Sequence, residues 1–258
     1  MNRGELQTSC ALVALLLIAI GIVMGGVANF GKRPLPRGLH LPVLAMELLR
    51  SDQDDPSAIV GPAGHDPGND RCQMAAQMYL DFTFIPTYTL LFVLVGAVLY
   101  SQGYRRHGVL VCLLIIAAAG FDVLENCAIL SVLGVPTNSK LLRLLQCVAA
   151  RGSAPRLWSL IKWALIFVVL AVAARVYFDP QLPTLRRWMG FLAGGLWLAA
   201  SALGLGGVVF KTDRLIEAAT KPMVLGSLVG LAFFATHSWL AQGLLAALNR
   251  LAGWRWFR

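Results

Sequence analysis

The sequence predicts an all-α fold, a polytopic bundle of six transmembrane helices. Of its 258 residues 57% are hydrophobic and only 14% are charged, whereas a soluble domain carries about 25% charged residues. The mean hydropathy is +0.68. The apolar residues also form runs of about 20 residues, the length that a helix needs to cross a bilayer. These observations argue against a soluble globular protein and against a disordered chain.

Six segments have the required length and apolar character. The first lies within residues 9–30, and the other five form a membrane core over residues 79–248. We predict spans at 10–30, 79–100, 109–135, 158–176, 188–210 and 223–248. The loop at 31–78 is too short for an independent domain, so residues 1–258 form a single membrane domain.

The first segment has a second interpretation. Arg3, an apolar stretch and the small residues Gly26, Val27 and Ala28 are also typical of a cleaved secretory signal. The apolar run is longer than a usual signal core, which favours a retained anchor. If the segment is cleaved, the mature protein has five spans.

The distribution of basic residues predicts the orientation. With a cytoplasmic amino terminus, nine Lys and Arg residues lie in inner loops and twelve in outer loops. Five of those twelve lie in the long loop, and long loops count for less in the positive-inside rule. Without the long loop, nine basic residues lie in inner loops and seven in outer loops, which favours two cytoplasmic termini. Because the formal charge of +9 is concentrated beside apolar runs, we expect lipid headgroups as partners and no nucleic acid.

Two short helices are expected outside the spans. Residues 41–50 have the apolar spacing of an amphipathic helix. So do residues 141–150, which we expect to lie along the membrane interface. The rest of the long loop brings five acids among Pro and Gly residues, namely Asp52, Asp54, Asp55, Asp66 and Asp70. The spacing of a calcium loop is missing, so we predict an irregular, solvated stretch in which residues 54–68 tolerate deletion.

No spacing of Cys or His residues suits a metal site, and we expect neither a metal nor another cofactor. The five cysteines are interpreted as free thiols or small apolar residues. A Cys72–Cys147 disulfide stays open, should both residues face an oxidising compartment.

Ionisable side chains inside the spans define the candidate site. A charge in a span is costly unless it is paired or hydrated, so each one is a functional candidate. Three consecutive spans, the second, third and fourth, contribute Asp81 and Tyr88, then Asp122, Glu125 and Asn126, then Lys162. Residues at i, i+3 and i+4 share one helix face, which places the three residues of the third span together.

These residues can meet in one half of the bilayer. The third span returns to the side from which the second enters and the fourth leaves. Lys162 lies about 6 Å into its span and Glu125 about 15 Å from the end of its own, at the rise of an α-helix. Three acids against one base leave a surplus, so two acids must be protonated, hydrated or bound to a cation. A polar cluster that only holds helices together is the alternative.

Two other features of the spans are weaker candidates. His237, in the sixth span, is a secondary binding candidate. Small residues favour close helix packing, which is the role we expect for a set of glycines in the fifth span, Gly194, Gly195, Gly204, Gly206 and Gly207.

The motifs around the candidate site resemble those of a group of uncharacterised bacterial multi-span membrane proteins. The shared features are LDFxFIPxY, then DxxEN, then a Lys-Trp pair early in the following span, over residues 41–175. The resemblance implies a bacterial inner-membrane location and no particular activity.

Three function classes remain open. A non-catalytic membrane or accessory protein, with an unknown protein partner, is favoured. The first alternative is a pathway for a proton, small cation or solute, in which Asp122 and Glu125 carry the charge, Lys162 exchanges with them and Asp81 is a gate. The second is an intramembrane lipid-modifying enzyme, although no nucleophile motif is present. We therefore assign no catalytic residue.

Overall fold

The computed structural model describes residues 3–27, 30, 34–50, 54–61, 70–135, 139–152, 155–178 and 184–236. In these residues the regular structure is helical throughout, with no strand. Six helices are long and apolar enough to cross a membrane. They are α1 (Arg3–Val27), α4 (Asp70–Ser101), α5 (Arg105–Val132), α7 (Pro155–Ala173), α8 (Thr184–Val209) and α9 (Asp213–Ala235). The predicted all-α bundle with six candidate spans is confirmed.

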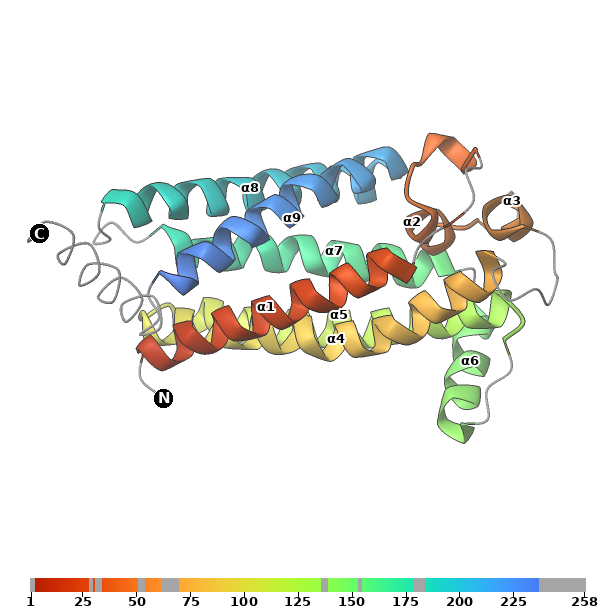
Figure 1. Ribbon diagram of the computed structural model, residues 1–258, viewed down its shortest axis with the longest axis horizontal. Helices are drawn as coiled ribbons and strands as arrows, with labels where there is room; N and C mark the ends of the chain where they lie inside the picture. Colours follow the sequence, from red (N-terminus) through yellow and green to blue (C-terminus); the bar gives the residue numbers. More distant parts are fainter. Residues whose placement is uncertain are drawn as a thin grey trace, which may run out of the picture.

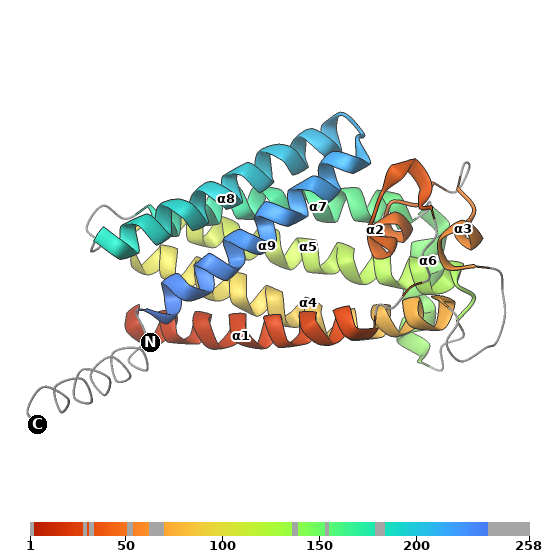
Figure 2. The same cartoon turned by 45° about the horizontal axis from the view of Figure 1, so that its top comes forward.

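The six long helices form a closed ring in which each helix packs against the next one in the chain. Helix α1 contacts α4, α4 contacts α5, α5 contacts α7, α7 contacts α8 and α8 contacts α9, and α9 returns to α1. Their axes run along the long direction of the molecule (Figure 1). The start of α1 and the end of α9 lie at one end of the bundle, and the short helices lie at the other (Figure 2).

The outer surface of this ring is apolar. Large hydrophobic side chains are exposed along the long helices, among them Ile22 on α1, Leu113 on α5, Leu192 on α8 and Val224 on α9. Apolar surface is unfavourable in water by about 25 cal/mol per Å², and lipid removes that penalty. With six spans and this exterior, the chain is an integral, multi-pass membrane protein.

Two spans begin earlier than the sequence pattern indicates. Helix α4 begins at Asp70 instead of residue 79, and α9 begins at Asp213 instead of residue 223. The first turns of both helices are polar, so a search for apolar runs does not find them. In α9, Pro222 lies inside the helix, just before the predicted start at residue 223. These two helices therefore begin about two to three turns before the predicted spans.

A short segment covers one end of the bundle. This capping segment, residues 34–50 and 54–61, contains the 3-10 helix η1 (Pro36–Gly38), α2 (Pro42–Glu47) and α3 (Pro56–Val60). Helix α2 lies within the predicted helix at 41–50. It contacts α5 and α7, and its side chains Leu44, Ala45 and Met46 are buried.

The loop remainder, predicted to be solvated, is partly buried in its described part. Ile59 and Val60 of α3 are 2% and 0% exposed and belong to the main hydrophobic core. Two apolar side chains among the acids are enough to bury this turn. Asp55 begins α3 by accepting a hydrogen bond from the Ser57 backbone N–H at 2.8 Å, and its hydrogen bonds from Ser57 lower the pKa of Asp55. Ile59 and Val60 therefore contribute to core packing, and the tolerance of residues 54–68 to deletion stays a prediction.

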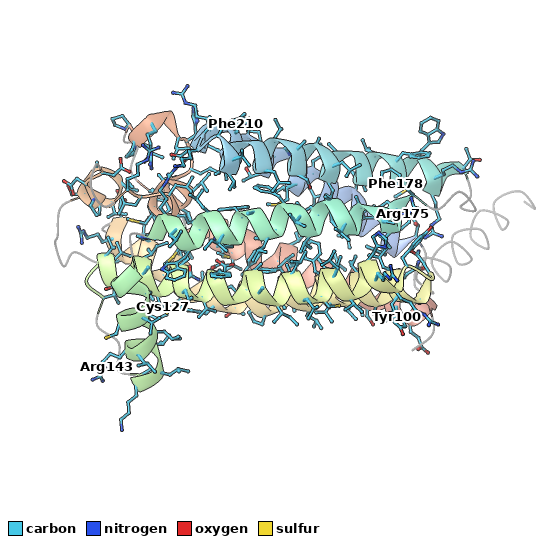
Figure 3. The ribbon with its side chains drawn as sticks, turned by 180° about the vertical axis from the view of Figure 1, so that it is seen from behind. Tyr100, Cys127, Arg143, Arg175, Phe178 and Phe210 are labelled. Atoms are coloured by element: carbon cyan, nitrogen blue, oxygen red, sulfur yellow. The ribbon has the colours of Figure 1, made fainter. Side chains whose placement is uncertain are left out.

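Helix α6 (Lys140–Gly152) projects sideways from the capped end of the bundle (Figure 1). One side of it packs on the bundle, where Leu142 and Leu145 contact a small cluster around Cys127 and Trp158. Its other apolar residues are exposed, with Leu141 at 65% and Leu144 at 63%. Figure 3 shows Arg143 on the part of α6 that points away from the spans. The helix predicted at 141–150 is confirmed, and its position along the membrane interface stays a prediction.

Glycines allow close contacts between helices, as predicted for part of the fifth span. A Cβ atom at Gly194, Gly204 or Gly207 would overlap Phe178, Phe167 or Ile216 respectively. Gly195 and Gly206 face open space, so the packing role does not extend to them. All five cysteines are free thiols, and the Cys72–Cys147 disulfide that the sequence left open is not formed.

Candidate functional site

The candidate site is centred on Lys162 of α7. Its Nζ lies 2.6 Å from Oε2 of Glu125 and 3.1 Å from Oδ1 of Asp122. Both acids point from one face of α5, as their spacing predicts. The side chains are buried, since Glu125 is 0% exposed and Asp122 and Lys162 are each 4% exposed. Three charges therefore meet where little water reaches them.

Helix α4 completes the arrangement predicted from the spans. The hydroxyl of Tyr88 donates to Oδ2 of Asp122 at 2.8 Å. One turn of α5 further on, Asn126 donates through Nδ2 to Oδ2 of Asp81 at 2.6 Å. The structure thus brings together all six residues that the sequence selected in spans two to four.

The structure adds a fourth acid that the sequence did not select. Glu47, at the end of α2, places Oε2 3.4 Å from Nζ of Lys162. The same oxygen accepts a hydrogen bond from Nε1 of Trp163 at 2.9 Å. The signal in the sequence was a single acid among the apolar residues of 41–50, but only the folded capping segment carries it to α7.

We call this set the acid–lysine cluster: Glu47, Asp81, Asp122, Glu125 and Lys162, with the donors Tyr88 and Asn126. Four carboxyl groups gather around one ammonium group. Within the described residues, no second Lys or Arg forms an ion pair with any of the four. Neither oxygen of Glu125 has a conventional hydrogen-bond partner there, and Glu125 is held by its ion pair with Lys162. The surplus of acid is larger than the sequence indicated.

A cavity of about 920 Å³ adjoins the cluster. It lies between the capping segment and the spans, with Phe30 beyond α1, Trp163 on α7 and Thr220 on α9 in its wall. Glu47 belongs both to this wall and to the cluster. Its side chain is 13% exposed, compared with 5% for Lys162. The cavity therefore reaches the cluster through Glu47.

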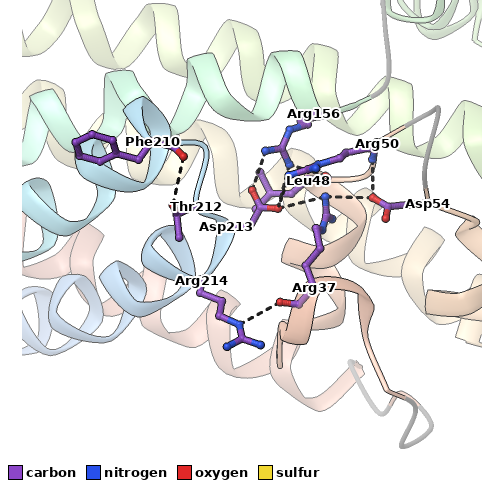
Figure 4. A network of polar contacts seen from close by, with 9 residues as sticks. All are labelled: Arg37, Leu48, Arg50, Asp54, Arg156, Phe210, Thr212, Asp213 and Arg214. Carbon is purple, nitrogen blue, oxygen red and sulfur yellow. Dashed lines mark hydrogen bonds and ion pairs between the residues drawn. The ribbon is translucent and has the colours of Figure 1, made fainter.

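A second ionic group fastens the capping segment to the spans (Figure 4). In this capping network, Arg156 of α7 lies 2.8 Å from Asp213 of α9. Arg37 lies 3.2 Å from Asp213 and 3.1 Å from Asp54, and the backbone N–H of Arg50 donates to Asp54 at 2.8 Å. The network joins η1, the end of α2 and the starts of α7 and α9.

Arg37 occupies a strained position in this network. Its φ is +57°, a left-handed conformation that is unfavourable by about 1–2 kcal/mol for residues other than glycine. Nε of Arg214 donates to its carbonyl at 3.1 Å, and the two aspartates hold its guanidinium group. Burial lowers the pKa of Arg37, and the charges of Asp213 and Asp54 oppose that shift.

Glu217 of α9 provides another anchor for the capping segment. Its Oε1 accepts hydrogen bonds from the backbone N–H groups of His40 and Leu41, both at 2.8 Å. These are the residues just before α2, so Glu217 fixes where that helix begins. Sequence reasoning missed Glu217, Asp213 and Arg156, because each lies just outside a predicted span.

In the part of the chain that the structure describes, no three His, Cys, Asp or Glu side chains are placed to hold a metal ion. His237, the secondary candidate, lies outside the described residues.

Comparison of the chain with protein-family models, with curated proteins and with solved structures finds no match. The resemblance of its short motifs to a bacterial group stays an expectation.

Proposed function

We propose that this protein is a non-enzymatic membrane protein that binds and releases protons at the acid–lysine cluster, as part of a pathway for protons or small cations. The observation that carries the proposal is the grouping of four carboxyl groups around Lys162. Asp122 and Glu125 are the proton-carrying groups and Lys162 exchanges charge with them. Compared with the hypothesis drawn from the sequence, the proposed pathway includes one more carboxyl group, that of Glu47.

The charge balance favours this chemistry over simple helix pairing. A buried ion pair is stable only when each charge has its partner, and an uncompensated buried ion costs several kcal/mol. Lys162 neutralises one of the four acids. Tyr88 and Asn126 supply one neutral donor each, which stabilises a carboxylate but does not cancel its charge. Protons are the smallest species that can neutralise the rest.

The position of Glu47 favours exchange with one side of the membrane. Glu47 lies between the buried pair on α5 and the cavity at the capped end. In the opposite part of the bundle, Tyr177 packs its ring against Trp197 and Phe233 at centroid distances of 5.1 Å. Polar groups thus lie toward the cap, and aromatic packing fills the other part. Proton exchange is accordingly expected from the capped end.

Proton movement through reconstituted protein tests the proposal. The full chain in liposomes, with an enclosed pH-sensitive dye and an imposed potential, should acidify the lumen faster than liposomes without protein. Glu125→Gln and Asp122→Asn should each slow this acidification several-fold. Asp55→Asn, which changes an exposed carboxylate of the capping segment, is the matched control. Wild-type vesicles that acidify no faster than empty ones would favour an accessory role, in which the cluster only specifies helix packing.

We also propose a bacterial inner-membrane location, with α1 retained as an anchor and both termini in the cytoplasm. The motif resemblance and the excess of Arg, 17 of 22 basic residues, support the location. Contacts of α1 with α4 and α9 support retention, since cleavage would remove one member of the ring. Sequencing the amino terminus of the mature protein, and labelling cysteines introduced at residue 5 and beyond residue 250, tests both points.

A further inference from the structure

The walls of the 920 Å³ cavity have a distinct composition. Pockets for small molecules have volumes of about 300–1,000 Å³, with mostly apolar walls and a few placed polar groups. Nine lining residues are apolar, among them Phe30, Val43, Leu44 and Trp163. The polar ones are His40, Glu47 and Thr220. A ligand that fits these walls has a hydrocarbon body.

Among the described residues that line this cavity, Glu47 is the one acid. Its Oε2 is used by Lys162 and Trp163. Within the described residues Oε1 accepts no hydrogen bond, and the Glu47 residue lines the cavity. Lys162 does not line the cavity, so a ligand meets the carboxylate and not the ammonium group behind it.

The location also selects for an amphiphile. The cavity lies at the capped end, beside the last part of α1 and the first part of α9, and both helices expose apolar side chains further along, such as Ile22 and Val224. A molecule already dissolved in the bilayer, with its polar head at the interface, has its hydrocarbon part at the depth of these helices.

We infer that this cavity binds an amphiphile that carries a primary ammonium head group, with the ammonium on Oε1 of Glu47 and the hydrocarbon against the apolar walls. A charge-assisted hydrogen bond to a carboxylate is roughly twice as strong as a neutral one. An anionic head group would meet Glu47 with like charge, and an alcohol would form only the weaker bond. The order of affinity is therefore amine, then alcohol, then carboxylate.

This inference goes beyond the proton proposal, because it requires only Glu47 and the cavity. Binding at equilibrium is measured without any transmembrane flux. A failure to conduct protons would leave it intact, and a failure to bind amines would leave the proton proposal intact.

Binding of matched probes to the purified full chain in a non-ionic detergent tests the inference. Dodecylamine, dodecanol and dodecanoate have the same chain and differ in the head group. We expect the amine to bind about tenfold more tightly than the alcohol, the factor that one charge-assisted hydrogen bond supplies. Native mass spectrometry, with protein-free micelles as the reference for partitioning, reports the bound fraction.

Three variants make the test specific. Glu47→Gln keeps an acceptor for Trp163 but loses the charge, so it should abolish the preference for amine over alcohol. Val43→Trp fills the cavity and should weaken binding of all three probes. Asp55→Asn should bind as the wild type does. Equal binding of amine and alcohol to the wild type, or a preference that persists in Glu47→Gln, overturns the inference.

The ammonium group has two natural sources, a free amine or an ethanolamine lipid, and nanodiscs distinguish them. One arm contains phosphatidylcholine and phosphatidylethanolamine in equal parts, and the other contains phosphatidylcholine with added dodecylamine. Retention of phosphatidylethanolamine by the wild type and its loss in Glu47→Gln identifies the lipid as the source. Retention of dodecylamine alone supports the inference with a free amine as the ligand. Retention of neither overturns it.

Discussion

The acid–lysine cluster and the capping network lie at the same end of the molecule but have opposite charge balance. In the cluster, four acids surround one base. In the network, Arg37, Arg50 and Arg156 surround Asp54 and Asp213. Lys162 and Arg156 are six residues apart on α7, about 9 Å along the helix at 1.5 Å per residue. An acid-rich centre thus adjoins a base-rich rim.

Burial explains why the two groups have different chemistry. The arginine side chains of the network are 15–31% exposed, so water or lipid headgroups can compensate their excess charge. Glu125 is fully buried and Lys162 nearly so. Surplus charge there must be neutralised inside the protein, which is the basis of the proton proposal. The network, by contrast, is suited to holding the capping segment in place.

The largest effect is expected when the cluster loses its base. Lys162→Met leaves four acids without an ammonium group, and removing one side of a buried ion pair costs about 3–5 kcal/mol. The free energy of unfolding in detergent measures this loss. The double variant Lys162→Met/Glu125→Gln should recover part of it, because the two side chains are in contact. Losses that simply add would show that Glu125 is not the principal partner. Lys221→Met, at an exposed position, is the matched control.

Breaking the capping network should cost less stability than breaking the cluster, and the two effects should be separable. Asp213→Asn loses its ion pairs with Arg156 and Arg37, a loss of about 2 kcal/mol for hydrogen bonds to charged groups. Because the network holds the capping segment, trypsin should cleave after Arg37 and Arg50 faster than in the wild type. Asp55→Asn, whose hydrogen bonds are local, should not speed this cleavage. Unchanged cleavage in Asp213→Asn would contradict the anchoring role.

The smallest effect is expected from a neutral donor in the cluster. Tyr88→Phe removes the hydroxyl that donates to Asp122, a loss of about 1 kcal/mol for a single hydrogen bond. Combined with Asp122→Asn, the loss should be less than the sum of the two single losses. Additive losses would mean that the two side chains do not share a hydrogen bond in the membrane.

The comparison of the two groups also shows what the sequence could predict. Asp122, Glu125 and Lys162 stand out because they interrupt apolar runs, and their helical spacing places them on a common face. Their depths and faces together predicted that Lys162 and the two acids can meet in one half of the bilayer. The relative positions of these residues are set by regular helices, whose geometry is known in advance.

Other residues depend on how irregular segments fold back, and the sequence pattern did not reveal them. Glu47 reaches Lys162 only because α2 lies over the ends of α5 and α7. Asp213 and Arg156 lie in first helical turns that are too polar to be recognised as spans. Ile59 was concealed among acids that suggested a solvated loop. In each case the contacting residue is distant in sequence, and apolar periodicity does not predict such a contact.

Infrared spectroscopy of the purified protein at neutral pH tests the central claim most directly. A protonated carboxyl group absorbs at a C=O stretching frequency distinct from that of a carboxylate. We predict such a band in the wild type, sensitive to exchange into D2O. It should be reduced in Asp122→Asn or Glu125→Gln and retained in Asp55→Asn. A wild-type spectrum without this band, or a band that both cluster variants leave unchanged, would contradict the claim that the surplus acids hold protons.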